Sequence, residues 1–360
     1  MQRFAYTTEL STAALDAFDA IIDVRSPSEF AEDHLPGAIN LPVLDDSERT
    51  RVGTHYTQVS AFEARRMGAA RVSRNIARHL ETRLADRPKA FRPLVYCWRG
   101  GMRSQSMAMV LASVGWRVTL VEGGYRTWRR QVVAALDSLA PARPVVIDGQ
   151  TGTGKTALLH ALADAGEQII DLEGLARHRG SIFGDLVAAP QPGQKAFETA
   201  LHCALRDLDP GRPVFIEAES KHVGKRRLPP ALWQAMQDAP RIRVRAPVPA
   251  RARFLVETYA DLMTDPARLT AAIDGLRPLH PRSRIDGWQD LARSGQWLAL
   301  AETLIRDHYD PAYDRARKRQ PARPGEGEIV LDRIGSEQIR LAARAVARTG
   351  SHTPTIDPQP

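Results

Sequence analysis

Short apolar runs separated by polar stretches mark the chain up to about residue 140. Runs at 20–24, 38–41 and 94–96 have the length of buried strands and end at polar or glycine-rich turns. The stretch 44–90 is polar, and its apolar residues repeat at the spacing of one helix face. Those residues are Phe62, Met67, Val72, Ile76 and Leu80. Residues 116–133 then predict a strand, a Gly-Gly turn and a helix.

The alternation of predicted strands and helices starts again after a Pro- and Ala-rich stretch at 137–144. Helical spacing covers 249–314, in which HYDPAYD at 308–314 predicts a helix end followed by a turn. Residues 328–347 predict one more strand and helix. Four apolar runs in this half predict strands, at 145–148, 168–171, 213–216 and 242–246.

Strands that alternate with helices predict an α/β protein with a parallel sheet flanked by helices in each half. We place the domain boundary near residue 140, which gives a first domain at 1–140 and a second at 141–348. The second domain includes the helical segment 249–314 as its C-terminal helical part. The polar, Pro-containing residues 349–360 predict a disordered tail.

The composition is typical of a water-soluble globular protein, with 43% apolar and 26% charged residues. No apolar run approaches the roughly 18 residues of a membrane span, and the first residues lack the layout of a signal peptide. We therefore expect a cytoplasmic protein without a membrane partner. Cys97 and Cys203 are expected as free thiols, and they are too few for a structural zinc site.

The charge balance favours a polyanionic partner. Lys and Arg number 50 against 42 Asp and Glu, which gives a net charge of +8 and a pI near 9.8. Nucleic acid is the first candidate, and solvated helix faces are the alternative. Residues 315–327 are basic and rich in Pro and Gly, as in a loop or an arm facing nucleic acid. Further candidates for phosphate or RNA contacts are Arg177, Arg179, Lys221, Lys225 and Arg226.

Cys97 follows the strand at 94–96 and opens the loop CWRGGMRS, after which a helix begins. Glycines let backbone N–H groups converge on one point, and arginines stabilise a negative charge beside the sulfur. The thiolate is the nucleophilic form of cysteine, so the pattern predicts Cys97 as a catalytic nucleophile. The alternative is a small buried apolar residue. The predicted anion-binding loop comprises Trp98, Arg99, Gly100, Gly101 and Arg103.

A second motif, GQTGTGKT at 149–156, lies between an apolar strand and an amphipathic helix, which is the context of a phosphate-binding P-loop. Its glycines allow backbone N–H groups to approach phosphate oxygens, and Lys155 can reach the terminal phosphate. Thr156 could hold Mg²⁺, and whether a nucleotide binds stays open. The predicted phosphate-binding residues are Gly149, Gly152, Gly154, Lys155 and Thr156.

The strand at 213–216 ends at two carboxylates, Glu217 and Glu219. P-loop proteins keep a base or a metal-orienting residue at such a strand end. We favour Glu219 for this role over Glu217. The alternative is that one of the two pairs with the basic run that follows.

Several motifs of the first domain resemble those of the rhodanese family. They are the Asp-x-Arg and His-x-Pro-Gly-Ala of DVRSPSEFAEDHLPGAINLP, the cysteine loop and EGGYRTWR. The resemblance implies a parallel sheet with Cys97 at the base of an anion-binding pocket. Asp23 and Arg25 are expected to pair and to tie loops together.

The loop from Cys97 to Arg103 departs from the sulfurtransferases of this family. It is one residue longer, and its length is similar to that in rhodanese-fold phosphatases. This leaves open a phosphatase reaction in which Cys97 attacks phosphorus and Arg103 binds the equatorial oxygens.

Taken together, the two halves resemble the tRNA 2-selenouridine synthase family. The resemblance implies conversion of wobble 2-thiouridine to 2-selenouridine with selenophosphate as selenium donor. It also implies an S-geranylated intermediate made with geranyl diphosphate, whose diphosphate the P-loop would grip. The stretches that carry the resemblance are 53–69, 97–108, 149–156, 177–184, 214–220 and 308–313.

The same resemblance implies two partners, a tRNA recognised at its anticodon loop and an enzyme that produces selenophosphate. Trp98 and Trp128 are candidates for stacking on an unstacked base, and either could instead belong to the core. Another class of function stays open. In it, a rhodanese-fold phosphatase or sulfur carrier is fused to a P-loop kinase and has no RNA substrate.

Overall fold

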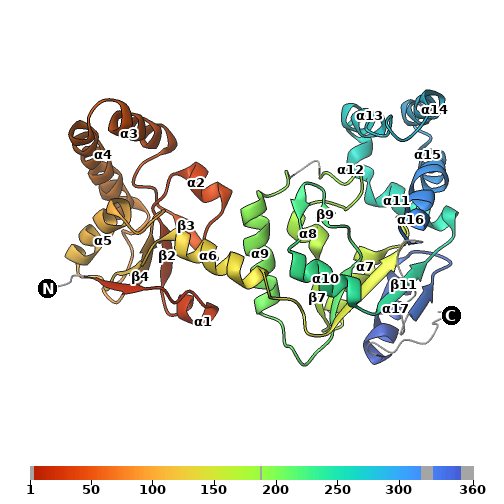
Figure 1. Cartoon of the computed structure of the whole chain (residues 1–360), viewed down its shortest axis with the longest axis horizontal. Coiled ribbons are helices and arrows are strands. Elements are labelled where there is room, and N and C mark those ends of the chain that lie inside the picture. The colour runs from red at the N-terminus through yellow and green to blue at the C-terminus, as the bar shows by residue number, and fades with distance from the viewer. Residues whose placement is uncertain (1–3, 187–188, 318–326, 350–360) are drawn as a thin grey trace. The chain divides into compact units, whose positions relative to one another are not determined.

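The computed structural model describes residues 4–186, 189–317 and 327–349, and the chain divides into two compact units (Figure 1). The first unit comprises Met1–Ala135 with Gly193–Thr199, and the second comprises Leu136–Pro192 with Ala200–Pro360. Residues 193–199 therefore group with the first unit, although they lie in the second half of the sequence. The predicted tail from residue 350 on, and most of the predicted basic arm, lie outside the described residues.

The first unit is built on a five-stranded sheet in which every pair of neighbouring strands is parallel. The prediction of a parallel sheet flanked by helices is confirmed. The edge strand β1 was not predicted, because three residues are too few to show alternation. In sheet order the strands are β1 (Ala5–Thr7), β5 (Thr119–Val121), β4 (Pro93–Tyr96), β2 (Ala20–Asp23) and β3 (Ala38–Asn40).

Helices α1 to α6 accompany this sheet in the described part of the unit, and α3 packs along α4 in the insertion before β4. Val72, Ile76 and Leu80 of α4 pack on the core as predicted. Phe62 does not, since it is 70% exposed. Ala64 lies on the buried face of α4. Phe62 lies two residues before Ala64, and residues two apart on a helix point in nearly opposite directions, so Phe62 faces away from the core. The helices are α1 (Thr12–Leu15), α2 (Pro27–Glu32), α3 (Asp46–Gln58), α4 (Ala61–Thr82), α5 (Met102–Val114) and α6 (Tyr125–Leu136).

The second unit contains another five-stranded parallel sheet. Helices α7 and α17 pack together, and their apolar residues join those of the sheet in one core. In sheet order the strands are β12 (Gly327–Val330), β11 (Arg241–Arg245), β6 (Pro144–Gly149), β8 (Val214–Glu217) and β7 (Gln168–Ile170). The accompanying helices are α7 (Lys155–Asp164), α8 (Leu172–Ala176), α9 (Gln194–Arg206), α10 (Pro230–Asp238) and α17 (Ser336–Thr349).

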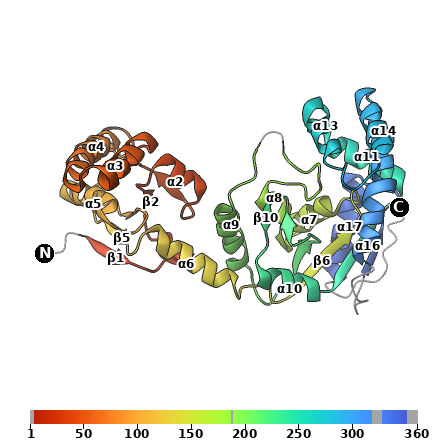
Figure 2. The same cartoon turned by 45° about the horizontal axis from the view of Figure 1, so that its top comes forward.

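The predicted helical segment is present and has its own apolar core, in which α13 and α14 lie side by side (Figures 1 and 2). The expected helix end at 308–314 is wrong. A π-helical turn at Ile305–Tyr309 leads directly into the next helix, and Asp310 N–H donates to the carbonyl of Ile305. The wider turn lets the helix continue into Pro311, which has no N–H to donate. The helices are α11 (Val248–Thr258), α12 (Ala260–Met263), α13 (Pro266–Asp274), α14 (Arg282–Arg293), α15 (Trp297–Leu304) and α16 (Asp310–Arg317).

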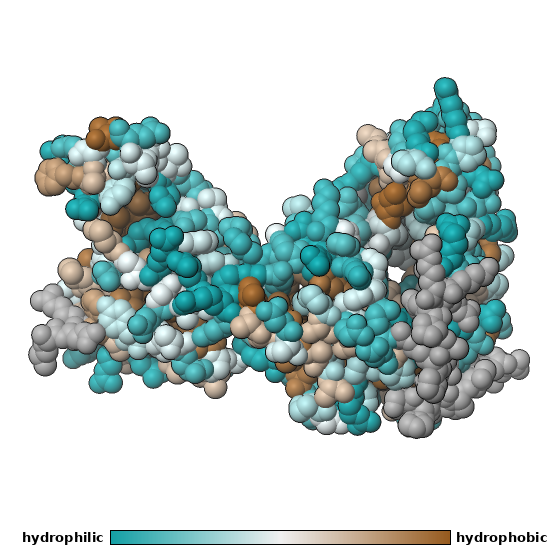
Figure 3. All heavy atoms as spheres, viewed as in Figure 1, coloured by the Kyte–Doolittle hydropathy of each residue, from teal (hydrophilic) through white to brown (hydrophobic). Residues whose placement is uncertain are grey.

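Hydrophilic residues cover most of the face of the molecule that Figure 3 shows. Among the described residues, no helix is long and apolar enough to cross a membrane.

The cysteine loop and the P-loop each follow a strand at the point where the strand order reverses. The chain leaves β2 for one edge of the first sheet and returns on its other side as β4, which leads into Cys97. In the second sheet β6 has β8 on one side and β11 on the other, and β6 leads into the P-loop. Ligands of parallel α/β sheets bind at such reversal points, outside the carboxyl ends of the strands.

The Gly-Gly turn after β5 lies against the cysteine loop. Tyr125 N–H donates to the carbonyl of Cys97 at 2.8 Å, and Arg126 N–H donates to that of Trp98 at 3.2 Å. Gly124 has a φ of +63°, and a Cβ at this position would overlap the carbonyl oxygen of Cys97. The EGGY motif is therefore a structural support for the loop that carries Cys97.

We predict that Gly124→Ala destabilises the first unit by about 2 kcal/mol or more, because the backbone must shift and the positive φ is strained. The measurement is the unfolding midpoint of the full chain in urea. Gly101→Ala is the matched control, since a Cβ there meets no atom within 4 Å. Equal midpoints for the two variants would contradict the supporting role of the turn.

Candidate active-site loops

Cys97 lies at the bottom of its loop and is 3% exposed. The Ser104 hydroxyl, from the first turn of α5, lies 3.2 Å from Cys97 Sγ and 3.1 Å from the carbonyl oxygen of Gly101. A hydroxyl that can donate to sulfur stabilises the thiolate form. No role was predicted for Ser104, although it ends the CWRGGMRS motif.

The two predicted arginines of this loop differ in their surroundings. Arg99 is exposed, whereas Arg103 is half-buried and forms two hydrogen bonds to the carboxylate of Glu29, at 2.6 and 3.2 Å. Burial works against ionisation of Glu29, but its bonds to Arg103 outweigh burial and lower its pKa. An anion that binds Arg103 would therefore compete with Glu29 for the guanidinium.

Trp98 and Trp128, the two candidates for stacking on a base, differ in burial. Trp98 is half-buried and stacks on Tyr125, with 5.2 Å between ring centroids. Trp128 is 1% exposed, so it belongs to the core and cannot stack on an RNA base. The expected pair of Asp23 and Arg25 forms at 2.6 Å and is fully buried.

The P-loop joins β6 to α7 as the motif predicts. Gly149 has a φ of +154°, and a Cβ there would lie 2.5 Å from the carbonyl oxygen of Val244 on β11. Only glycine allows the loop to leave the sheet so close to its neighbouring strand. Lys155 Nζ donates to the carbonyl of Gly149 at 2.9 Å, and Gly152 and Gly154 complete the loop at positive φ.

Three glutamates gather beside Thr156. The Thr156 hydroxyl lies 2.8 Å from Glu217 Oε2 and 3.2 Å from Glu173 Oε2. Glu219, which we favoured from the sequence, lines the polar pocket beside the P-loop. Glu217 is fully buried and makes the hydrogen bond with Thr156. Glu173 was not predicted, because it comes from α8 and meets Thr156 only in the folded chain.

Burial and mutual repulsion keep this cluster partly protonated. Burial, reinforced by the Glu173 carboxylate, raises the pKa of Glu217 to about 8. Burial and a neighbouring carboxylate also raise the pKa values of Glu173 and Glu219. A cation at this place would relieve the repulsion.

The donors fit Mg²⁺, which takes oxygen ligands and keeps several from water and substrate phosphates. The Thr156 hydroxyl and the Glu217 carboxylate would hold it, with phosphate oxygens completing its shell. Across the described ranges, no group of three or more His, Cys, Asp or Glu side chains forms a metal site by itself.

A buried arginine supports the P-loop from the helical segment. Arg251 Nε donates to the carbonyl of Thr151 at 2.9 Å, and its terminal nitrogens donate to Asp310 at 2.7 and 3.0 Å. Arg251 is 1% exposed. Asp310 belongs to the HYDPAY stretch, so that stretch is tied directly to the P-loop.

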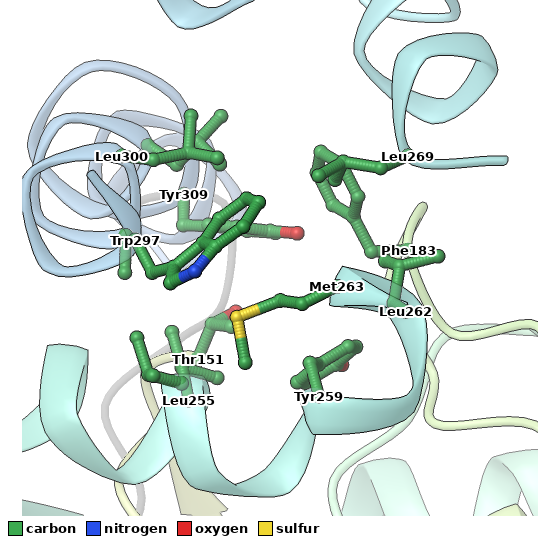
Figure 4. Close-up of a pocket in the computed structure, with 13 residues that line it drawn as sticks. Thr151, Phe183, Leu255, Tyr259, Leu262, Met263, Leu269, Trp297, Leu300 and Tyr309 are labelled. Atoms are coloured by element: carbon green, nitrogen blue, oxygen red, sulfur yellow. The ribbon is translucent and has the colours of Figure 1, made fainter. Parts of the chain in front are cut away.

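Two adjoining pockets open at the P-loop. The polar one is lined by Lys155, Thr156, Glu219 and Arg179. The other is apolar and lies among the helices of the helical segment (Figure 4). Residues that line both pockets are Thr151, Leu255, Tyr259 and Tyr309.

The predicted basic residues fall into two groups. Arg179 lies at the polar pocket beside the P-loop, where it pairs with Asp261 at 3.0 Å. Arg177, Lys221 and Lys225 are exposed, and Arg226 is half-buried. A short hairpin is formed by β9 (His222–Val223) and β10 (Arg226–Arg227). Arg226 belongs to this hairpin, and Lys221 and Lys225 directly adjoin its strands.

Known proteins resemble the chain along nearly its whole length. Residues 7–131 match the model of the rhodanese-like domain, and residues 142–277 match that of the tRNA 2-selenouridine synthase AAA domain. A tRNA 2-selenouridine synthase of Nitrosomonas europaea is 32% identical over 89% of this chain and 96% of its own length. The chain belongs to the tRNA 2-selenouridine synthase family.

Two further relatives in this family carry the same name. The protein of Chromohalobacter salexigens is 39% identical over 83% of this chain and 74% of its own length. That of Cupriavidus necator is 34% identical over 84% of this chain and 90% of its own length.

We predict that Glu217→Gln changes the pH dependence of stability, measured with a chelator present. The raised pKa of Glu217 means that its contribution to stability is full below about pH 4.5 and is lost as the pH rises through about 8. Above pH 8 the free energy of unfolding of the variant should therefore exceed that of the wild type by up to about 5 kcal/mol, because the pKa lies near 8 instead of 4.5 and each pH unit corresponds to about 1.4 kcal/mol. This difference should vanish near pH 4.5.

The control for this experiment is Glu257→Gln, which changes an exposed glutamate of α11. Thermal unfolding across the pH range checks the prediction. A Glu217→Gln curve that stays parallel to the wild-type curve at every pH would show that Glu217 is not held protonated in the folded chain.

Proposed function

We propose that this chain is a tRNA-modifying enzyme that replaces the sulfur of wobble 2-thiouridine by selenium. The observation that carries the proposal is a buried, hydroxyl-bonded Cys97 and a complete P-loop, each at the reversal point of its sheet, in one chain of this family. Selenophosphate is the proposed selenium donor and geranyl diphosphate the proposed activating substrate.

In the first step, the sulfur of 2-thiouridine attacks C1 of geranyl diphosphate. The C1–O bond breaks, diphosphate leaves with the electron pair, and the base loses the proton on N3. The P-loop amides and Lys155 would bind the leaving diphosphate, and Thr156 with Glu217 would hold a Mg²⁺ that neutralises its charge. This step uses no nucleotide hydrolysis.

In the second step, the geranylthio group is exchanged for selenium. The Cys97 thiolate adds to C2 of the base, and the bond from C2 to sulfur breaks as geranyl thiolate leaves and takes a proton. The selenium of selenophosphate then displaces Cys97 at C2, and water cleaves the phosphorus–selenium bond to release phosphate. The loop with Arg99 and Arg103 would bind the selenophosphate.

The RNA would contact exposed basic and aromatic side chains. Lys221 and Lys225 can neutralise backbone phosphates, which supply most of the affinity for RNA. Trp98 is half-buried and follows Cys97 in the loop, where it would contact an unstacked base of the anticodon loop beside Tyr125 and Lys195. An enzyme that joins selenide to phosphate must supply the selenophosphate.

We predict that Cys97→Ser abolishes 2-selenouridine in cellular tRNA and allows the S-geranylated nucleoside to accumulate, because only the exchange step needs the thiolate. Mass spectrometry of nucleosides from a deletion strain that expresses each variant provides the measurement. Cys203→Ser, which changes the other cysteine of the chain, is the control and should leave selenouridine at the wild-type amount. Unchanged selenouridine in Cys97→Ser would leave the phosphatase or sulfur-carrier alternative standing.

A further inference from the structure

The apolar pocket beside the P-loop is used by no step described above. Its walls come from α11, α12, α13 and α15, from the π-helical turn and from Phe183 (Figure 4). The lining is almost wholly apolar, and the hydroxyl of Tyr259 is already bonded to Ser181 at 3.0 Å. The pocket thus offers a large hydrocarbon surface and few groups for hydrogen bonding.

We propose that this pocket binds the hydrocarbon chain of a prenyl diphosphate whose diphosphate lies on the P-loop. The proposal rests on the function proposed above and assigns the site that selects the substrate. Thr151 belongs to the P-loop and also lines the apolar pocket, as do Leu255 and Tyr259 at the wall that both pockets share. One ligand with an anionic head and an apolar tail can therefore occupy both.

A nucleotide fits this pair of pockets poorly. Its base and ribose carry many donors and acceptors, and burying them against Leu255, Leu262 or Leu304 would leave them without partners. A hydrocarbon chain has no such groups and gains from leaving water. The lining therefore favours an isoprenoid over a nucleoside as the group attached to the diphosphate.

Met263 controls entry of the chain. The pocket has a cavity volume of about 80 Å³, whereas a cavity of about 150 Å³ is known to hold benzene. A ten-carbon chain thus needs a side chain to move. Met263 projects into the middle of the pocket between Trp297 and Tyr259 (Figure 4), is half-buried, and has the flexible side chain that such a movement requires.

Leu300 and Leu269 limit the length of the chain. Both lie across the pocket from Thr151 in Figure 4, so they meet the end of the chain that is farthest from the diphosphate. Leu300 is 5% exposed and Leu269 6%, so both are fixed in the core of the helical segment.

Calorimetry with the full chain and Mg²⁺ tests the proposal, with inorganic diphosphate, dimethylallyl, geranyl and farnesyl diphosphate as ligands. For the wild type we expect geranyl diphosphate to bind at least about tenfold more tightly than inorganic diphosphate, with a more negative heat capacity change. Met263→Trp should lower this affinity ratio by about tenfold, because the indole fills the entry. Leu300→Ala should shift preference from geranyl to farnesyl diphosphate by about tenfold.

Two controls separate the outcomes. Leu298→Ala changes a half-exposed leucine on the same helix as Leu300 and should keep the wild-type preference. Lys155→Ala should weaken all four ligands together, since they share the diphosphate. Thermal unfolding of each variant checks that the helical segment is folded, and Met263→Trp provides the test if Leu300→Ala unfolds.

Equal affinity of the wild type for inorganic and geranyl diphosphate would overturn the chain pocket while leaving the role of Cys97 intact. An unchanged chain preference in both Met263→Trp and Leu300→Ala would also overturn it. If geranyl diphosphate failed to bind at all while a nucleoside triphosphate bound, the proposed first step itself would fail.

Discussion

The close approach of two backbone segments at a glycine is the constraint on which both candidate sites depend. At Gly124 the turn after β5 touches the carbonyl of Cys97, and at Gly149 the P-loop leaves β6 against the carbonyl of Val244. Neither place has room for a Cβ. These contacts hold each loop close to its sheet, so that backbone N–H groups, a thiol or a lysine are positioned before any ligand arrives.

Local patterns in the sequence predict most of this arrangement. Buried strands appear as short apolar runs, and the cysteine loop and P-loop are contiguous motifs whose chemistry depends on neighbouring residues. The helical segment is also clear from its periodicity. What the sequence does not reveal are contacts between distant positions. Glu173 meets Thr156 from 17 residues away, and Arg251 meets Asp310 from 59 residues away.

The two wrong predictions also arose where contacts or backbone geometry of the folded chain override a local sequence pattern. The spacing of Phe62 fits a helix face, but the register of that face is fixed by the packing of α3 on α4. Pro311 ordinarily signals a helix end, yet the π-helical turn before it lets the helix continue. As a result Asp310 reaches Arg251, and the helical segment that forms the apolar pocket is joined to the P-loop.

In the proposed reaction, the P-loop carries the diphosphate chemistry and Cys97 the exchange of sulfur for selenium. The most direct test supplies Lys155→Ala with a synthetic RNA that already carries S-geranyl-2-thiouridine, together with selenophosphate, and follows selenouridine formation. Because this substrate bypasses the P-loop step, the variant should convert it at about the wild-type rate. A wild-type enzyme that converts this RNA and a Lys155→Ala variant that does not would contradict the division of labour between the two loops.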